Sequence, residues 1–300
     1  MRFRLPRFKR VSSVASLDLT ERDLEIVRLV HRHRFLRSSH IILLIGTSSQ
    51  QVLRRLKLLY HHGYLERPRS QIDYYHGGGS RPIVYGLGNK GGSLLKRELS
   101  SVSRNVSWGE KNRFIGWIFL EHALLVSDVM VSIELACRKS EVKFIPSHEF
   151  LTTGRYFPSR WKVRLNNQTK LGVIPDRVFA LEFRDGHQTV QRVYYFLEAD
   201  RGTMPIIRHN LSQTSIYRKF LAYAATWSQS IHRTRFGFDR FRVLTITPGP
   251  KRVESLISAC SGLKSGQGLF LFADRSILNN PEHILKGWKT CRGKMEALSR

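Results

Sequence analysis

Three helix-length segments, each with its own start or stop signal, open the chain and limit what its first third can fold into. Thr20 and Asp23 form a capping-box pattern, so a helix is predicted over 20–33. A second, shorter helix is predicted over 38–45, because Gly46 follows it directly. Leucines at helical spacing predict a third helix over 48–61. The sequence therefore begins with a compact helical unit.

Two short extended segments follow these helices and predict a hairpin. Residues 64–67 and 83–87 are rich in strand-forming side chains, and the polar stretch between them contains three consecutive glycines at 77–79. Three helices followed by a hairpin describe a winged helix-turn-helix, which we expect over 18–100. Residues 1–17 are expected to be a basic flexible arm, and residues 101–112 a linker.

Strands and helices alternate in the remainder, which we expect to form a second domain over 113–300. Helices are predicted over 115–138, 210–228 and 252–260, and strands over 143–145, 148–151, 173–183, 192–200, 240–247 and 268–272. This order predicts an α/β domain with a mixed sheet flanked by helices, and an α+β chain overall.

Positive charge is the strongest compositional signal. The chain has 50 Lys and Arg against 23 Asp and Glu, a formal net charge of +27. Such a balance predicts a polyanionic partner, and we expect double-stranded DNA rather than a membrane. No stretch is long and apolar enough to span a bilayer, and no apolar secretory segment follows the basic N-terminus. Three distant cysteines predict no disulfide framework, so a cytoplasmic location is expected.

The second helix of a helix-turn-helix enters the major groove, so the segment 48–61 supplies the candidate DNA-reading residues. Gln can read adenine, and Arg can read guanine or hold phosphate. The candidates are Ser49, Gln50, Gln51, Arg54, Arg55 and Lys57 on the helix, with Arg67, Arg69 and Arg81 flanking the hairpin. The competing interpretation is a solvated basic face on a helical protein-interaction domain.

Acidic residues are scarce in the second domain, so their positions are informative. Asp176 lies at the start of one predicted strand, and Glu198 and Asp200 end the next on the same face. Clustered carboxylates repel one another, and a divalent cation relieves that cost. Oxygen ligands favour Mg²⁺ or Mn²⁺, which can activate a water against a phosphodiester. In the competing structural interpretation, Asp200 caps the turn before Gly202, and Glu198 pairs with an arginine, Arg201 or Arg218.

These residues resemble the plasmid replication-relaxation family. The resemblance rests on Pro175–Asp176, on the run from Glu198 to Thr203, and on a following helix that carries Lys219 and Tyr223. The family is similar to PD-(D/E)XK nucleases, which have the restriction-endonuclease-like fold, and is related to a class of mobilisation relaxases. The resemblance implies a protein that nicks or relaxes DNA at the origin of a plasmid or mobile element, with other replication or mobilisation proteins as further partners.

Carried over to this chain, the resemblance implies that Asp176 and Glu198 are metal ligands, with Asp200 beside them. The nuclease motif has a lysine two positions after the glutamate, where this chain has Asp200. Lys219 could supply the ammonium from the next helix, or Arg201 could replace it in part. The acidic residue of the first helix would be Asp128, with Glu121 and Glu134 as alternatives on that helix and Glu149 as an alternative on the next strand. A tyrosine nucleophile would be Tyr194 or Tyr217. The departure at position 200 leaves a second function open, that of a non-catalytic DNA-binding accessory protein. A third is a protein-docking adaptor.

Overall fold

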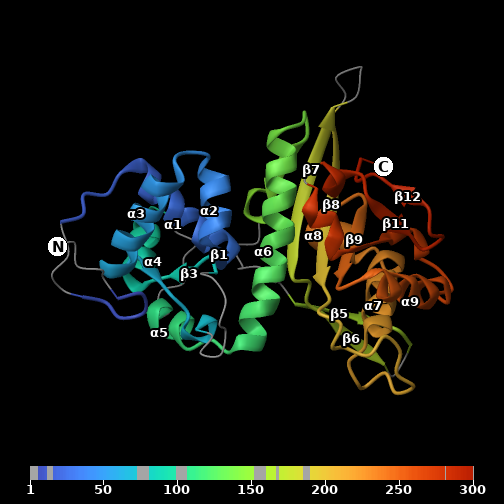
Figure 1. Cartoon of the computed structure of the whole chain (residues 1–300). Coiled ribbons are helices and arrows are strands. Elements are labelled where there is room, and N and C mark those ends of the chain that lie inside the picture. The colour runs from blue at the N-terminus through green and yellow to red at the C-terminus, as the bar shows by residue number, and fades with distance from the viewer. Residues whose placement is uncertain are drawn as a thin grey trace. The chain divides into compact units, whose positions relative to one another are not determined.

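Figure 1 shows the computed structural model of the chain, which describes residues 6–11, 16–72, 81–98, 107–151, 160–166, 169–184, 190–280 and 282–299. It is a mixed α+β structure that divides into two compact units, Met1–Val131 and Ser132–Arg300. The boundary lies inside helix α6 (Trp117–Arg138), and not in the segment 101–112 that we expected to be the linker.

The first unit combines helices with a small antiparallel sheet. Its elements are α1 (Glu21–His33), β1 (Phe35–Arg37), α2 (Ser38–Ile45), α3 (Ser49–His61), β2 (Leu65–Glu66), β3 (Val84–Leu87), α4 (Asn89–Glu98) and α5 (Trp108–Arg113). The three strands pair in the order β1-β3-β2, with Phe35 opposite Gly86 and Leu65 opposite Leu87. The expected glycine-rich tip at 77–79 lies outside the described residues.

Local signals set the helix ends as the sequence predicted. The Thr20 backbone N–H donates to Asp23 Oδ2 at 2.8 Å, and the Asp23 N–H donates back to Thr20 Oγ1 at 3.4 Å, so the capping box is present. Gly46 ends α2 in the left-handed conformation, with its N–H donating to the Ile42 carbonyl. These contacts satisfy backbone groups that a helix end would otherwise leave without partners.

Two predictions for segments at the ends of this unit were wrong, because tertiary contacts order residues that we expected to be irregular. Residues 6–11 are not a free arm, because the Arg10 guanidinium bonds to Glu66 and to two backbone carbonyls; the rest of the arm at 1–5 and 12–15 lies outside the described residues. Residues expected in the linker form α5 instead, where the buried Asn112 donates to the Leu87 carbonyl at 2.8 Å. Residues 99–106 of that segment are likewise outside the described range.

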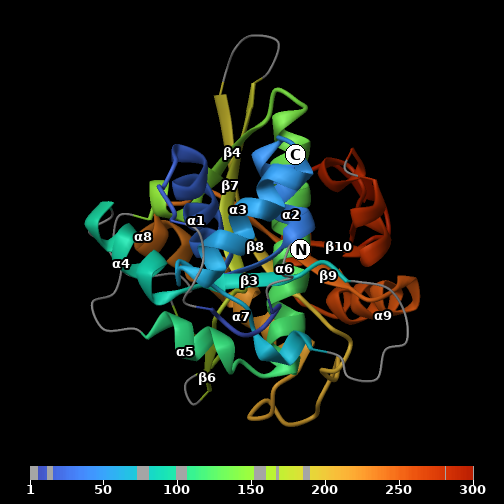
Figure 2. The ribbon, with the colours of Figure 1, turned by 60° about the vertical axis from the view of Figure 1, so that its left-hand side comes forward.

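The second unit is built on a seven-stranded mixed sheet in the order β12-β11-β10-β9-β8-β7-β4. These strands are β4 (Lys143–Pro146), β7 (Arg177–Arg184), β8 (Val190–Ala199), β9 (Phe241–Thr247), β10 (Phe270–Asp274), β11 (Trp288–Thr290) and β12 (Met295–Glu296). A separate pair joins β5 (Trp161–Arg164) and β6 (Lys170–Val173). The helices are α7 (Ile216–Ser228), α8 (Ile231–Phe236) and α9 (Pro250–Ser261). Figure 2 shows α9 beside β9 and β10.

Alternation along β8 decides which side chains meet the helices. Tyr194 and Phe196 face a core built with α7 and α9, in which Phe220, Tyr223 and Leu256 are buried. Glu198 continues the same face at the end of the strand, as predicted. β8, β9 and β10 run parallel, so their carboxyl ends lie at one edge of the sheet. This is the edge at which open α/β sheets commonly bind ligands.

Several predicted segments in this unit were wrong. The strand expected over 173–183 is interrupted at 174–176, which separates β6 from β7. The strand expected over 148–151 is a short 3₁₀ turn at Ser147–Glu149, and α7 begins only at Ile216 because Ser215 caps it. Cys260 and Cys291 form a disulfide with their Cα atoms 6.0 Å apart, contrary to the expectation that the distant cysteines give no disulfide framework.

Arg55 is expected to be a stabilising residue of the first unit. Its Nε donates to Asp23 Oδ1 at 2.8 Å, and Asp23 is fully buried. Burial opposes the ionisation of Asp23, but hydrogen bonds from Arg55 and Thr20 outweigh it and lower the pKa of the carboxyl. Arg55→Ala should therefore reduce the free energy of unfolding by about 3 kcal/mol at neutral pH, since it leaves a buried charge unpaired.

Denaturant unfolding measures this effect, with the exposed neighbour Arg54→Ala as the matched control. Because the pKa of Asp23 is lowered in the folded state, its contribution is present at neutral pH and is lost as the pH falls through that pKa. The difference between wild type and Arg55→Ala should shrink in acid. Equal stability of wild type and Arg55→Ala at neutral pH would contradict this role for Arg55.

Candidate functional site

The pairing of β7 with β8 places two acidic residues side by side at the sheet edge. Arg177 lies opposite Leu197, so the preceding residue, Asp176, lies opposite Glu198. The Asp176 N–H donates to the Leu197 carbonyl at 3.0 Å, and the Ala199 N–H donates to Asp176 Oδ2 at 2.7 Å. Directly opposed residues on antiparallel strands have Cβ atoms about 5 Å apart. The two side chains therefore form one acidic pair.

Two residues of α7 hold the Glu198 carboxylate. Lys219 Nζ lies 2.5 Å from Glu198 Oε2, and the Tyr223 hydroxyl donates to Oε1 at 2.5 Å. Lys219 and Tyr223 are four residues apart and so lie on one face of the helix. Glu198 is 5% exposed, and the Tyr223 ring is fully buried. The acidic pair is thus joined to a cation and a phenol from one helix.

Burial and neighbouring charge set the protonation of this group. Burial raises the pKa of Glu198, and Asp176 adds to this shift while Lys219 opposes it. Burial also opposes the charged form of Lys219, but attraction from Glu198, Asp176 and Asp200 prevails and raises the pKa of its ammonium. Burial and the adjacent Glu198 raise the pKa of Tyr223, so its phenol remains a donor. Lys219 is therefore a cation at neutral pH.

Asp200 has a different set of partners. Arg252 of α9 contacts both of its carboxylate oxygens, with Nε 2.5 Å from Oδ2, and the Thr247 hydroxyl donates to Oδ2 at 3.0 Å. The Gly202 N–H donates to Oδ1 at 2.9 Å, and Gly202 has a φ of +84°, a conformation that favours glycine. Asp200 therefore caps the turn after β8, as the structural interpretation of the sequence expected.

The members of the predicted acidic trio have different bonding partners. Lys219 binds Glu198 beside Asp176, whereas Arg252 binds Asp200, whose charge still acts on Lys219. Among the residues that the structure describes, no three His, Cys, Asp or Glu side chains are grouped closely enough to hold a metal ion. Glu198 pairs with Lys219.

Three other candidate residues, Asp128, Tyr194 and Tyr217, have partners outside this group. Asp128 belongs to the first unit, where Arg37 and His40 contact its carboxylate. The Tyr194 ring stacks on Phe238 with centroids 4.0 Å apart, and the Tyr217 hydroxyl donates to the Gly262 carbonyl at 3.5 Å. Neither contact favours a nucleophilic tyrosine.

Sequence reasoning missed Arg252 and Thr245. Arg252 lies 52 residues after Asp200, and no local pattern relates the two. Thr245 is the strand partner of Glu198 across β8 and β9, and its buried Oγ1 has no hydrogen-bond partner among the described residues. A polar atom buried without a partner beside an acidic pair is typical of a site that binds water or a ligand.

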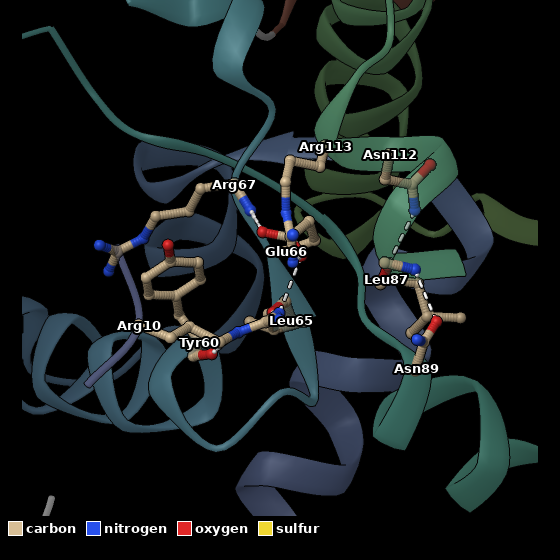
Figure 3. Close-up of polar contacts among 10 residues, drawn as sticks. Arg10, Tyr60, Leu65, Glu66, Arg67, Leu87, Asn89, Asn112 and Arg113 are labelled. Atoms are coloured by element: carbon tan, nitrogen blue, oxygen red, sulfur yellow. Dashed lines mark hydrogen bonds and ion pairs between the residues drawn. The ribbon is translucent and has the colours of Figure 1, made fainter. Parts of the chain in front are cut away.

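The predicted DNA-reading residues divide into exposed and internal ones. Those exposed to solvent are Ser49, Gln50, Gln51, Arg54, Arg69 and Arg81, and Lys57 is half-buried. Arg55 is tied to Asp23, and Arg67 is buried with its guanidinium 4.1 Å from the Tyr60 ring centroid. Figure 3 shows Arg67 beside Tyr60. Arg55 and Arg67 therefore stabilise the first unit, which revises their predicted role.

The family model for replication-relaxation matches residues 27–239, more than two thirds of the chain and parts of both units. The chain therefore belongs to the replication-relaxation family, which indicates a role in plasmid replication or relaxation. Comparison with curated proteins and with solved structures finds no significant match. Among the described residues, no helix combines the length and apolarity needed to cross a membrane.

Removing the Arg252 side chain should destabilise the second unit. Arg252→Ala would leave the Asp200 carboxylate, whose side chain is 4% exposed, without its cationic partner. The expected loss is about 3–5 kcal/mol in the free energy of unfolding. Denaturant unfolding measures it, with the exposed neighbour Lys251→Ala as control. Should Arg252→Ala unfold like the control, Asp200 would not depend on Arg252.

Proposed function

We propose that this protein binds duplex DNA through its first unit and nicks one strand at Asp176, Glu198 and Lys219. The observation that carries the proposal is the Lys219 ammonium bound to Glu198 beside Asp176. A cation and two carboxylates at the carboxyl edge of a sheet suit phosphodiester chemistry. Membership in the replication-relaxation family supports DNA at an origin of a plasmid or mobile element as the substrate.

The order of elements in the first unit supports a winged helix-turn-helix. α2 and α3 form the helical pair, and β2 and β3 form the hairpin that follows. α3 exposes Gln50, Gln51 and Arg54 at its N-terminal half, while Val52 and Leu56 are buried. Side chains in the first turns of a recognition helix are the ones that reach base edges. We therefore assign α3 to the major groove.

The proposed cofactor is Mg²⁺ or Mn²⁺, and Asp176 and Glu198 would hold it. Magnesium is commonly bound by one or two carboxylates together with substrate phosphates, so a third protein carboxylate is not required. The buried Thr245 hydroxyl without a partner among the described residues, next to Glu198, also fits a polar occupant. Asp200 is left out of this set because Arg252 binds its carboxylate. The bound ion would lower the pKa of an attacking water.

The chain's own residues supply orientation and charge. Tyr223 donates to Glu198 and fixes that carboxylate at the edge of the sheet. Lys219 keeps its proton, so we assign it to stabilise the negative charge that develops on the phosphate, and not to act as a base. Lys219 thus takes the place of the lysine that the nuclease motif carries two positions after its glutamate.

A second function, a non-catalytic DNA-binding accessory protein, has its own support. The Glu198 and Asp200 carboxylates both contact a cationic side chain of the same chain. A nuclease-like sheet with its acids neutralised in this way could serve as a platform for other replication or mobilisation proteins. Activity decides between the two functions, because only the first requires Glu198 for strand cleavage.

A nicking assay on supercoiled plasmid that carries the cognate origin, in Mg²⁺ or Mn²⁺, tests the catalytic proposal. We expect wild type to produce nicked circles, and Glu198→Gln and Lys219→Met to be slower by about 10²–10³-fold, as when one charge-stabilising group is removed. DNA affinity should be unchanged in both variants. Lys251→Ala is the control. Full activity of Glu198→Gln would remove this site from the mechanism, and an inactive wild type would favour the accessory function.

Arg54 tests the DNA-reading assignment of α3. Arg54→Ala should weaken duplex binding by about tenfold, which corresponds to about 1.4 kcal/mol for the arginine's interaction with DNA. Fluorescence anisotropy with a labelled duplex measures the Kd. Lys264→Ala, an exposed position in the second unit, is the charge-matched control. An unchanged Kd for Arg54→Ala would place the DNA surface away from α3.

A further inference from the structure

The N-terminal segment 6–11 is fixed to the first unit by side-chain contacts that the proposed function does not explain. The Arg10 guanidinium donates to the Tyr60 carbonyl at 2.9 Å, to the Leu65 carbonyl at 3.0 Å and to Glu66 Oε2 at 2.9 Å. The Val11 N–H donates to His61 Nδ1 at 3.4 Å. Figure 3 shows Arg10 lying across the end of α3 toward Leu65 and Glu66. One arginine thus anchors this segment between α3 and β2.

Glu66 is the anchor point, and its surroundings carry an excess of positive charge. Its side chain is 2% exposed, and both Arg10 and Arg113 contact Oε2. The Arg67 backbone N–H donates to Glu66 Oε1 at 3.0 Å, whereas the buried Arg67 guanidinium lies over the rings of Tyr60 and Tyr85, 4.1 and 5.1 Å from their centroids. Two guanidinium groups therefore contact this one carboxylate. Such a cluster favours the approach of an anion.

The anchored segment itself is basic and lies beside the hairpin. The first seventeen residues of the chain contain five Lys or Arg and no Asp or Glu. Arg7 and Lys9 are exposed, and the Arg67 guanidinium donates to the Arg7 carbonyl. Arg67 directly follows β2 and precedes the exposed Arg69. The anchor therefore holds the segment that carries Arg7 and Lys9 against the base of the hairpin and the C-terminal end of α3.

We propose that segment 6–11 is a further DNA-contacting element, in which Arg10 bound to Glu66 is the tether and Arg7 and Lys9 contact the phosphate backbone. This inference rests on the proposed DNA-binding function and adds a contact surface outside α3 and the hairpin. The tether orders the segment before DNA arrives, so binding does not have to supply that conformational entropy. Arg10 is a positioning residue, and Arg7 and Lys9 are the contacts.

Salt-dependent affinity separates these roles. The full chain and its variants are titrated onto a short labelled duplex of mixed sequence at several salt concentrations. We expect Arg7→Ala with Lys9→Ala to reduce the magnitude of the negative slope of log Kobs against log salt by about 2, because each phosphate that a cation neutralises contributes about 1 to that magnitude. Arg10→Ala should weaken binding severalfold and leave the slope unchanged, because Arg7 and Lys9 remain but the segment must be ordered on binding. Lys264→Ala with Lys286→Ala is the control for net charge, since both lysines are exposed in the second unit.

The outcomes distinguish a failure of this inference from a failure of the proposed DNA-binding function. A wild-type slope for Arg7→Ala with Lys9→Ala, when Arg54→Ala still weakens binding, overturns the role of the segment and leaves α3 as the DNA surface. An equal decrease of slope in the Lys264 and Lys286 control also overturns it, as would binding of the segment to anionic lipid vesicles in place of DNA. Absence of any salt-dependent binding by wild type would instead contradict the proposed function itself. Because Arg7 and Lys9 are exposed, their variants remain informative even if Arg10→Ala does not fold.

Discussion

The second unit depends on one ion pair, between Lys219 on α7 and the buried Glu198 at the end of β8. A buried carboxylate is tolerated only when it is paired or protonated, and here an ammonium and a phenol from one helix face supply the partners. The same contacts fix α7 against the sheet edge where Asp176 lies opposite Glu198. A single interaction therefore joins the packing of the second unit to the geometry of its candidate site.

A second pair beside it has a different purpose. Arg252 binds Asp200 and also donates to the Met204 carbonyl at 2.5 Å. These contacts hold α9 against the segment that leads from β8 toward α7. The proposed nuclease-like site would have a lysine at position 200, where this chain has an acid instead. With Lys219 reaching Glu198 from α7, the cation is present although the local motif is altered. The position of the charge in space, and not its place in the sequence, matters for the proposed chemistry.

Local signals were predictable from the sequence, and long-range partners were not. The ends of α1 and α2 followed from Thr20, Asp23 and Gly46, because capping contacts span only three or four residues. The alternation that puts Glu198 on the α7 face also followed from the strand period. Arg67, in contrast, looks like a surface cation in the sequence, yet Tyr85, 18 positions away, makes it a buried one.

The same limit explains the remaining differences. Part of the segment expected as a linker forms α5, in which Asn112 donates to the Leu87 carbonyl, 25 positions earlier. The disulfide between Cys260 and Cys291 joins residues 31 positions apart, and spacing alone does not reveal such a pair. For the candidate site, Asp176, Glu198 and Lys219 could be named from the sequence. The pairing of Asp200 with Arg252 could not, because Arg252 lies on a later helix.

A crystal structure with Mn²⁺ and a short origin duplex would test the central claim most directly. The account predicts an anomalous peak held by the Asp176 and Glu198 carboxylates, with Lys219 directed at the adjacent phosphate and Asp200 still bound to Arg252. A structure that binds DNA with no ion at these carboxylates, or with the phosphate backbone far from Lys219, would contradict the proposed chemistry.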